Sequence, residues 1–162
     1  MTDSIAEDKL FKRVLTSVKT IAMVGVSSIK KEETSGSIKR RPSIIVMQYL
    51  QEFGYRVIPV NPFSVGKKIL GENVIAKLED IDTDVDLVNI FRPSNETPEI
   101  AQQAVKIGAK VIWLQFGIQN QKTQKIAQEA NIVYVSNRCI KQEYQRLFLK
   151  INPVFPALLQ TD

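Results

Sequence analysis

The sequence contains no histidine and a single cysteine, Cys139, and these scarcities exclude several kinds of chemistry. Without histidine the chain has no Ser-His or Cys-His catalytic pair and no phosphohistidine, and it lacks the commonest metal ligand. A lone cysteine cannot form an internal disulfide. The composition therefore favours binding over catalysis, and we expect no catalytic residue and no metal site.

Long apolar runs and a signal peptide are missing as well. No stretch approaches the ~20 apolar residues needed to cross a membrane, and residues 1–8 are acidic. We therefore expect a cytoplasmic protein with no membrane partner. The 162 residues, 44% of them hydrophobic, suffice for one core. We expect one domain over residues 19–150, with an N-terminal helix over 1–18 packed on it and a tail over 151–162.

Acidic residues are fewer than basic ones, and the imbalance is local. The net charge is +5, and residues 30–41 hold five basic side chains against two acidic ones. Such a segment suits a solvated surface, a nucleic acid or a polyphosphate ligand. No winged helix, zinc motif or aromatic-studded basic sheet accompanies it, so we expect no nucleic-acid partner. The sequence leaves open whether the chain binds a protein partner.

Strand-like and helix-like segments alternate along the chain. Short apolar segments end in polar turns, and segments with apolar residues at helical spacing lie between them. The predicted strands are 21–24, 55–60, 86–90, 110–114 and 132–135, with a further short one at 73–75, and the predicted helices are 4–17, 42–53, 95–107, 120–130 and 140–149. This alternation predicts an α/β protein with a three-layer, doubly wound Rossmann-like fold and a mostly parallel five- or six-stranded sheet.

Glycine is scarce where a dinucleotide site needs it. A Gly-x-Gly-x-x-Gly turn is expected after the first strand of such a site, but this chain reads Gly25-Val-Ser-Ser-Ile-Lys30. The second predicted strand ends in Asn61-Pro62, where an NAD site usually has an acidic residue for the ribose. Both features disfavour NAD. Ligands of open α/β sheets bind at the carboxyl ends of the strands, so the turns there form the candidate site.

The first and third turns carry candidate contacts to a nucleotide. Gly25 permits a tight exit from the first strand. Ser27 and the N–H groups around Pro42 to Ile44 suit a phosphate, because the dipole and unpaired donors at a helix N-terminus favour an anion. The Phe91 ring suits stacking on adenine, and the Arg92 guanidinium suits a phosphate. A purely structural role is the alternative at each of these positions.

The last two turns also leave binding and structural roles open. Gln115 and Gly117 offer an amide and an uncrowded backbone, and packing is the alternative for the glycine. Arg138 suits either a ligand contact or an exposed cation. Cys139 lies beside an apolar run, which is typical of a buried and unreactive thiol.

Specific strings of residues occur in a characteristic order. They are Ile21-Ala-Met-Val-Gly-Val-Ser27, Arg41-Pro-Ser43, Tyr49-Leu50, Gly54-Tyr-Arg-Val-Ile-Pro-Val-Asn-Pro62, Ile69-Leu-Gly-Glu72, Phe91-Arg92, Gly108-Ala-Lys-Val-Ile-Trp-Leu-Gln115, Gly117-Ile118 and Asn137-Arg-Cys139. Together they closely resemble the small stand-alone CoA-binding domain proteins, which are related in fold to the CoA-binding domain of the succinyl-CoA synthetase alpha subunit. The resemblance spans about residues 18 to 148.

The resemblance implies that coenzyme A lies across the carboxyl ends of the strands. It also implies which residues contact CoA. They are Gly25, Val26 and Ser27 at the phosphate turn, Arg41 and Ser43 near the phosphates, Asn61 and Pro62 at the second turn, Phe91 and Arg92 at the third, Gln115 and Gly117 on the pantetheine side, and Asn137 and Arg138 at the last turn. The chain departs from the family pattern in a longer segment between Ser27 and Arg41, and in Ile44, where a histidine often follows the serine.

These observations predict a protein that binds CoA or an acyl-CoA as a carrier, sensor or regulatory module, without a reaction of its own. One alternative is an enzyme, either a ligase or acyl-transfer subunit or an NAD(P)-linked oxidoreductase. The ligase relatives use a histidine that this chain lacks, and the oxidoreductase needs the missing glycines and acid. A DNA-binding redox repressor is disfavoured because residues 1–17 are too few for a DNA-reading domain.

Overall fold

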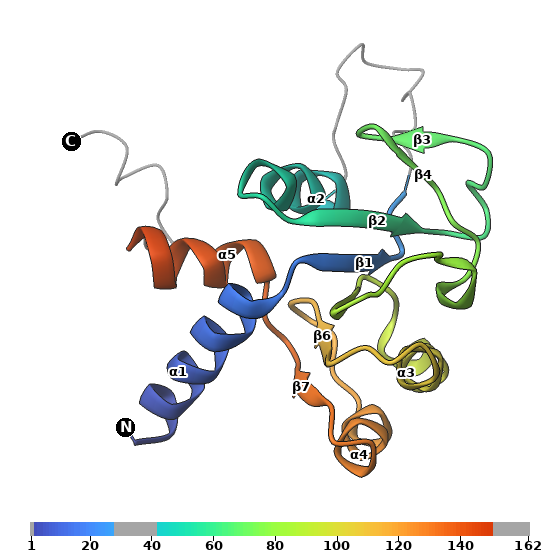
Figure 1. Ribbon diagram of the computed structural model, residues 1–162. Helices are drawn as coiled ribbons and strands as arrows, with labels where there is room; N and C mark the ends of the chain where they lie inside the picture. Colours follow the sequence, from blue (N-terminus) through green and yellow to red (C-terminus); the bar gives the residue numbers. More distant parts are fainter. Residues whose placement is uncertain (1, 28–41, 151–162) are drawn as a thin grey trace.

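The computed structural model describes residues 2–27 and 42–150, which form an α/β fold around one parallel sheet (Figure 1). Its strands are β1 (Thr20–Val24), β2 (Arg56–Val60), β5 (Leu87–Ile90), β6 (Val111–Leu114) and β7 (Val133–Val135). They are arranged in the order β2-β1-β5-β6-β7, and each neighbouring pair is parallel. The predicted Rossmann-like fold with a parallel sheet is confirmed.

Helices cover both faces of the sheet. Helices α1 (Thr2–Ser17), α2 (Pro42–Glu52) and α5 (Ile140–Tyr144) contribute to one buried cluster, whereas α3 (Thr97–Lys106) and α4 (Gln121–Glu129) contribute to the other (Figure 1). The chain turns to one face after β1 and to the opposite face after β5, so the winding reverses between these two adjacent strands. A crevice at the carboxyl ends of β1 and β5 follows from this topology.

Strand residues alternate between the two buried clusters because side chains on a strand point to opposite faces. Ile21 and Met23 of β1 face the helices α1, α2 and α5, whereas Ala22 faces α3 and α4. Trp113 and Ile112 of β6 divide in the same way. The strands are therefore apolar along most of their length, which is the pattern of a parallel sheet covered on both faces.

The described segments between the main elements contain a hairpin and short helical turns. Two short strands, β3 (Lys68–Ile69) and β4 (Glu72–Asn73), form an antiparallel hairpin outside the main sheet. The strand predicted at 73–75 reaches the main sheet only through one parallel bridge between Val60 and Ile75. Two 3₁₀ turns, η1 (Leu78–Asp80) and η2 (Ser94–Glu96), precede β5 and α3, and η3, a π-helical turn over residues 145–149, continues α5.

One polar side chain lies in the middle of the sheet. Asn89 of β5 is fully buried, and its Nδ2 donates to the Trp113 carbonyl at 3.2 Å and to Gln115 Oε1 at 3.4 Å. The same Gln115 oxygen accepts from the Ile140 N–H at 3.4 Å, at the start of α5. Asn89 and Gln115 therefore connect β5, the turn after β6 and the start of α5.

Helix α1 is fixed to the domain by ion pairs as well as by its apolar face. Asp8 accepts two hydrogen bonds from Arg146, at 2.8 and 3.0 Å, and Glu7 pairs with Arg138 at 2.7 Å. The Tyr55 hydroxyl also donates to the Leu15 carbonyl, and burial raises the pKa of Tyr55 to about 12. Within the part of the chain that the structure describes, no helix is long and apolar enough to span a membrane.

We predict that Asp8→Asn lowers stability at neutral pH by less than about 1 kcal/mol, because both side chains of the ion pair are more than a third exposed and solvent screens their attraction. Its hydrogen bonds with Arg146 lower the pKa of Asp8 in the folded protein. The ion pair therefore stabilises the fold above the unfolded-state pKa of about 3.9, and that contribution is lost as the pH falls through the folded-state pKa. Urea unfolding of both proteins at pH 7 and pH 3 measures the difference, with the exposed Asp82→Asn as the control. A difference that grows at pH 3 would contradict this account.

Candidate functional site

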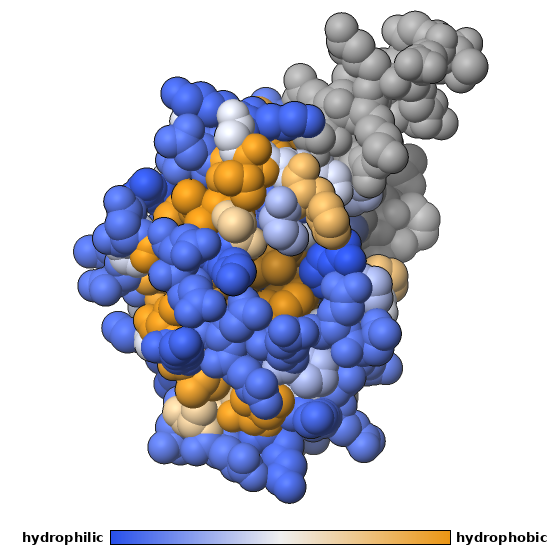
Figure 2. Space-filling view, turned by 90° about the vertical axis from the view of Figure 1, so that its right-hand side faces the viewer, coloured by the Kyte–Doolittle hydropathy of each residue, from blue (hydrophilic) through white to orange (hydrophobic). Residues whose placement is uncertain are grey.

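A cleft of about 720 Å³ lies at the carboxyl ends of β1 and β2. Apolar side chains line part of it. Polar and charged side chains from the turns after β1, β2 and β5, from the residue before η1 and from α3 line the rest. These residues are Val24, Gly25, Ser27, Val60, Asn61, Pro62, Phe63, Ser64, Lys67, Ala76, Lys77, Leu78, Arg92, Glu96, Glu99, Ile100 and Gln103. Figure 2 looks onto this side of the molecule, where apolar surface gathers near the middle among hydrophilic residues. The volume suits a nucleotide-sized ligand.

The first turn of the cleft depends on a glycine. Gly25 has a φ of +97°, which disfavours any residue with a side chain. A Cβ at this position would lie 2.9 Å from the Phe91 carbonyl oxygen and 2.9 Å from the Arg92 Cδ. The turn after β1 and the turn after β5 are therefore in direct contact. This contact brings two sequence-distant segments to one site.

The second turn is held by the side chain of Asn61. Its Nδ2 donates to the Val26 carbonyl at 2.9 Å, and its Oδ1 accepts from the Phe63 N–H at 2.9 Å. Both ends of the amide are thus used to join the turn after β2 to the turn after β1. Two further backbone bonds, Ser64 N–H to the Asn61 carbonyl and Lys67 N–H to the Ser64 carbonyl, each 3.2 Å, tighten this turn.

Arg92 and Glu96 form an ion pair at the cleft. Arg92 Nε donates to Glu96 Oε2 at 2.7 Å and Arg92 Nη2 donates to Glu96 Oε1 at 2.9 Å, a bidentate pair at the start of α3. These hydrogen bonds lower the pKa of Glu96 and raise that of Arg92. Both side chains remain about two-fifths exposed, so the guanidinium is accessible to a ligand from the cleft. Lys67, Lys77 and Glu99 are the other charged residues of the lining.

The structure gathers some of the predicted site residues around this cleft and places others elsewhere. Gly25, Ser27, Asn61, Pro62 and Arg92 line it. The predicted residues at its border are the fully buried Val26, whose carbonyl accepts from Asn61, and Ser43, whose Oγ accepts from the Ser27 N–H at 3.4 Å. Arg41 lies outside the described residues, as do the basic residues between 30 and 40.

The remaining predicted residues belong to the neighbouring turns. Phe91 is half-buried and packs on the cluster under α1, α2 and α5. Gln115 is buried, and the Gly117 N–H donates to Asn137 Oδ1 at 2.8 Å, so the last two turns are bonded to each other. Arg138 pairs with Glu7 on α1. A ligand-binding role for these residues stays a prediction.

Several lining residues were missed by sequence reasoning. Glu96, Glu99 and Gln103 lie three and four residues apart, so they share one face of α3 and its preceding turn. That spacing is visible in the sequence. Phe63 and Lys67 follow the Asn61-Pro62 turn directly, but no periodic pattern indicates that they face the cleft.

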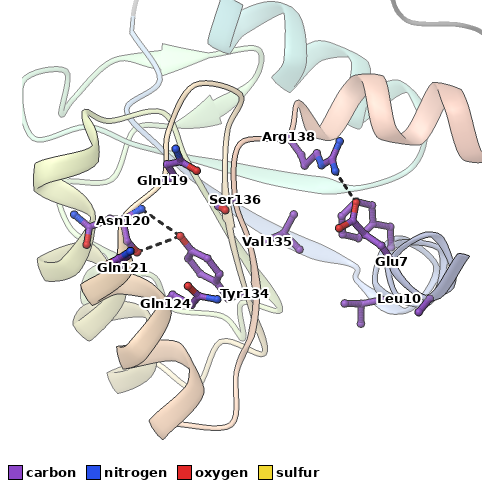
Figure 3. Close-up of a pocket in the computed structure, with 12 residues that line it drawn as sticks. Glu7, Leu10, Gln119, Asn120, Gln121, Gln124, Tyr134, Val135, Ser136 and Arg138 are labelled. Carbon is purple, nitrogen blue, oxygen red and sulfur yellow. Dashed lines mark hydrogen bonds and ion pairs between the residues drawn. The ribbon is translucent and has the colours of Figure 1, made fainter. Parts of the chain in front are cut away.

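A second cavity of about 710 Å³ lies between α1, the start of α4 and strand β7 (Figure 3). The two charged residues that line it, Glu7 and Arg138, pair with each other, and the Tyr134 hydroxyl is hydrogen-bonded to the Asn120 main chain (Figure 3). Its lining includes none of the turns after β1, β2 and β5. The cleft at those turns is therefore the better candidate.

The fold and the cleft define a class: a doubly wound α/β domain with a nucleotide-sized cleft beside the point where the winding reverses. Comparison with known protein families identifies a particular family within this class. The family described as CoA binding domain matches residues 19–145. The chain belongs to this family, and membership supports CoA-related binding.

Relatives and solved structures agree with this assignment. The uncharacterized protein YneT of Bacillus subtilis (strain 168) is 32% identical over 130 residues, which cover 80% of this chain and 88% of YneT. A hypothetical protein from Pyrococcus horikoshii OT3 is 38% identical, with a TM-score of 0.76 over 86% of this chain and 91% of that one. The protein cell-free ID.343 from Thermus thermophilus is 35% identical, with a TM-score of 0.76 over 87% and 98% of the two chains.

Proposed function

We propose that the protein binds coenzyme A or an acyl-CoA in the cleft at the carboxyl ends of β1 and β2, and that it carries, senses or regulates through this ligand without a reaction of its own. The observation that carries the proposal is the convergence of Gly25, Asn61 and Arg92, from three separate turns, on one cleft. Family membership supports the same ligand class.

The chemistry of the lining fits an anionic nucleotide with a flat base. CoA carries a diphosphate and a 3′-phosphate, and the described lining offers Lys67, Lys77 and Arg92 as cations. Arg92 uses its Nε and one N–H of its Nη2 on Glu96, so both N–H groups of Nη1 and the second N–H of Nη2 are left for a phosphate. Leu78 and Ile100 supply apolar surface for the parts of the ligand without charge.

An NAD(P)-linked oxidoreductase is less well supported by the same site. An NAD site needs an acidic acceptor for the ribose hydroxyls at the end of the second strand. Asn61 occupies that position, and its side-chain oxygen already accepts the Phe63 N–H while its nitrogen donates to Val26. The amide already serves the turn and carries no charge, so it is a weaker ribose acceptor than the carboxylate of an NAD site.

We predict that CoA raises the melting temperature of the purified protein and that NAD does not. At a CoA concentration 100-fold above its dissociation constant, binding to the folded state alone adds about 2.7 kcal/mol of stability. Differential scanning fluorimetry with each ligand measures the shift. Equal shifts with CoA and NAD would indicate generic nucleotide binding, and no shift with CoA would overturn the proposal.

A further inference from the structure

We propose that Phe63 is the residue on which the adenine ring of the bound ligand stacks. The inference rests on the proposed function, because it requires a ligand that carries a base. It goes beyond that function by assigning base recognition to one side chain. The evidence comes from the exposure of Phe63, the bonding of its turn and the nature of the surrounding walls.

Phe63 presents an unusually open aromatic surface within the cleft. The residue is 89% exposed, the largest exposure among the large hydrophobic residues of the described chain, and it lines the cleft. Among the described residues, its ring makes no aromatic contact within the protein, unlike Tyr49, Phe53 and Tyr144, whose rings contact one another in tilted and edge-to-face arrangements. The Phe63 ring is therefore free to pack against a ligand.

The backbone that carries this ring is well held. The Phe63 N–H donates to Asn61 Oδ1, and the next residue, Ser64, is buried and donates its N–H to the Asn61 carbonyl. Asn61 is itself bonded to Val26 in the first turn. The ring is thus presented from a fixed backbone, so a stacked base would lose little additional backbone freedom on binding.

The other walls of the cleft suit a flat aromatic group with polar edges. The lining contributes apolar side chains from β1, β2, η1 and α3, which are Val24, Val60, Leu78 and Ile100. Glu99 and Gln103 of α3 line the same cleft and offer oxygen acceptors that match the exocyclic amine of adenine. Phe91, in contrast, packs on the core beneath the other face of the sheet. Its ring is therefore less available for stacking than that of Phe63.

The test compares Phe63→Ala with a matched control, Phe116→Ala. Phe116 is also exposed, at 71%, and lies in the turn after β6, but it does not line this cleft. Calorimetry is carried out on the full chain with CoA, with adenosine 3′,5′-bisphosphate and with 4′-phosphopantetheine, which lacks the base. Because Phe63 is exposed, its truncation is expected to leave the melting temperature of the free protein nearly unchanged.

We expect Phe63→Ala to bind CoA about 5- to 150-fold more weakly than wild type, since stacking on an aromatic side chain contributes to that extent per base. The loss should recur with adenosine 3′,5′-bisphosphate and be absent with 4′-phosphopantetheine. Phe63→Trp keeps an aromatic ring and should bind CoA with an affinity close to that of wild type. Phe116→Ala should bind CoA like wild type.

Two outcomes would overturn the inference alone: wild-type affinity for CoA in Phe63→Ala, or an equal loss with CoA and with 4′-phosphopantetheine. The second of these would mean that the substitution acts through the turn rather than through the base. A wild-type protein that binds no CoA would overturn the proposed function, and the inference with it. The two failures are therefore distinguished by the wild-type titration.

Discussion

Replacing Gly25 with alanine is expected to have the largest effect of any single substitution at the cleft. The residue has a φ of +97°, and a left-handed conformation costs a non-glycine residue about 1 to 2 kcal/mol. The added Cβ would also lie 2.9 Å from the Phe91 carbonyl oxygen, a backbone atom that cannot rotate away. Relieving such overpacking costs a further 1 to 3 kcal/mol or so. Urea unfolding of Gly25→Ala should therefore show a loss of roughly 2 to 5 kcal/mol.

Gly54→Ala provides the matched control. Gly54 has a nearly identical φ of +95°, but a Cβ there would meet no atom within 4 Å. Its substitution should show the conformational cost without the contact, about 1 to 2 kcal/mol. The difference between the two variants then measures the contact between the turns after β1 and β5. Equal losses would mean that this contact does not constrain the site.

Gly25→Ala should also remove CoA binding. The Cβ would push against both Phe91 and the Arg92 side chain, so the turns after β1 and β5 must move apart. Misplacing a binding group by about 1 Å is enough to lose most of its interaction with a charged ligand. We expect Gly25→Ala to show no stabilisation by CoA in differential scanning fluorimetry, while Gly54→Ala retains it.

The second large effect is expected for Arg92→Ala. A charge-assisted hydrogen bond to a phosphate contributes on the order of 1.5 to 3 kcal/mol, so CoA affinity should fall by about 10- to 150-fold. The free protein should remain folded, because the Arg92–Glu96 pair is exposed and such pairs contribute little to stability. Calorimetric titration with CoA measures the affinity, and the melting temperature checks the fold.

Arg56→Ala is the control for a general loss of positive charge. Arg56 begins β2, at the opposite end of that strand from the cleft, and it pairs with Glu72 at 3.6 Å. The substitution removes the same charge at a distance from the site, so CoA affinity should change little. If both variants lost affinity equally, the effect would be one of net charge, and Arg92 would have no specific role in binding.

The order and type of the main elements follow from the sequence alone. Apolar segments of four to six residues, separated by segments with apolar residues at helical spacing, predicted the strands and helices within a few residues. The signal is strong because a parallel sheet covered on both faces leaves few polar positions in its strands. Gly25 and the Asn61-Pro62 turn were identified from the sequence for the same local reason. Each directly follows a strand, and strand ends are where such folds bind ligands.

Which of these turns form one site was decided only by the tertiary structure. The sequence placed five turns on one edge, but the turns after β1, β2 and β5 share a cleft, whereas Arg138 pairs with α1 at a separate cavity. The partners of Asn89 and Arg92 also depend on the packing of neighbouring elements.

A comparison of Phe63 with Phe91 shows why the tertiary structure decides which side chains face the cleft. Both aromatic residues follow the end of a strand by one to three positions, and sequence reasoning selected only Phe91 for the site. The pleat and the covering helices direct Phe91 toward the core cluster, whereas the hydrogen bonds of Asn61 hold the turn that leaves Phe63 exposed at the cleft. Local sequence determines where a strand ends, but the direction of a side chain beyond that end depends on contacts with distant residues.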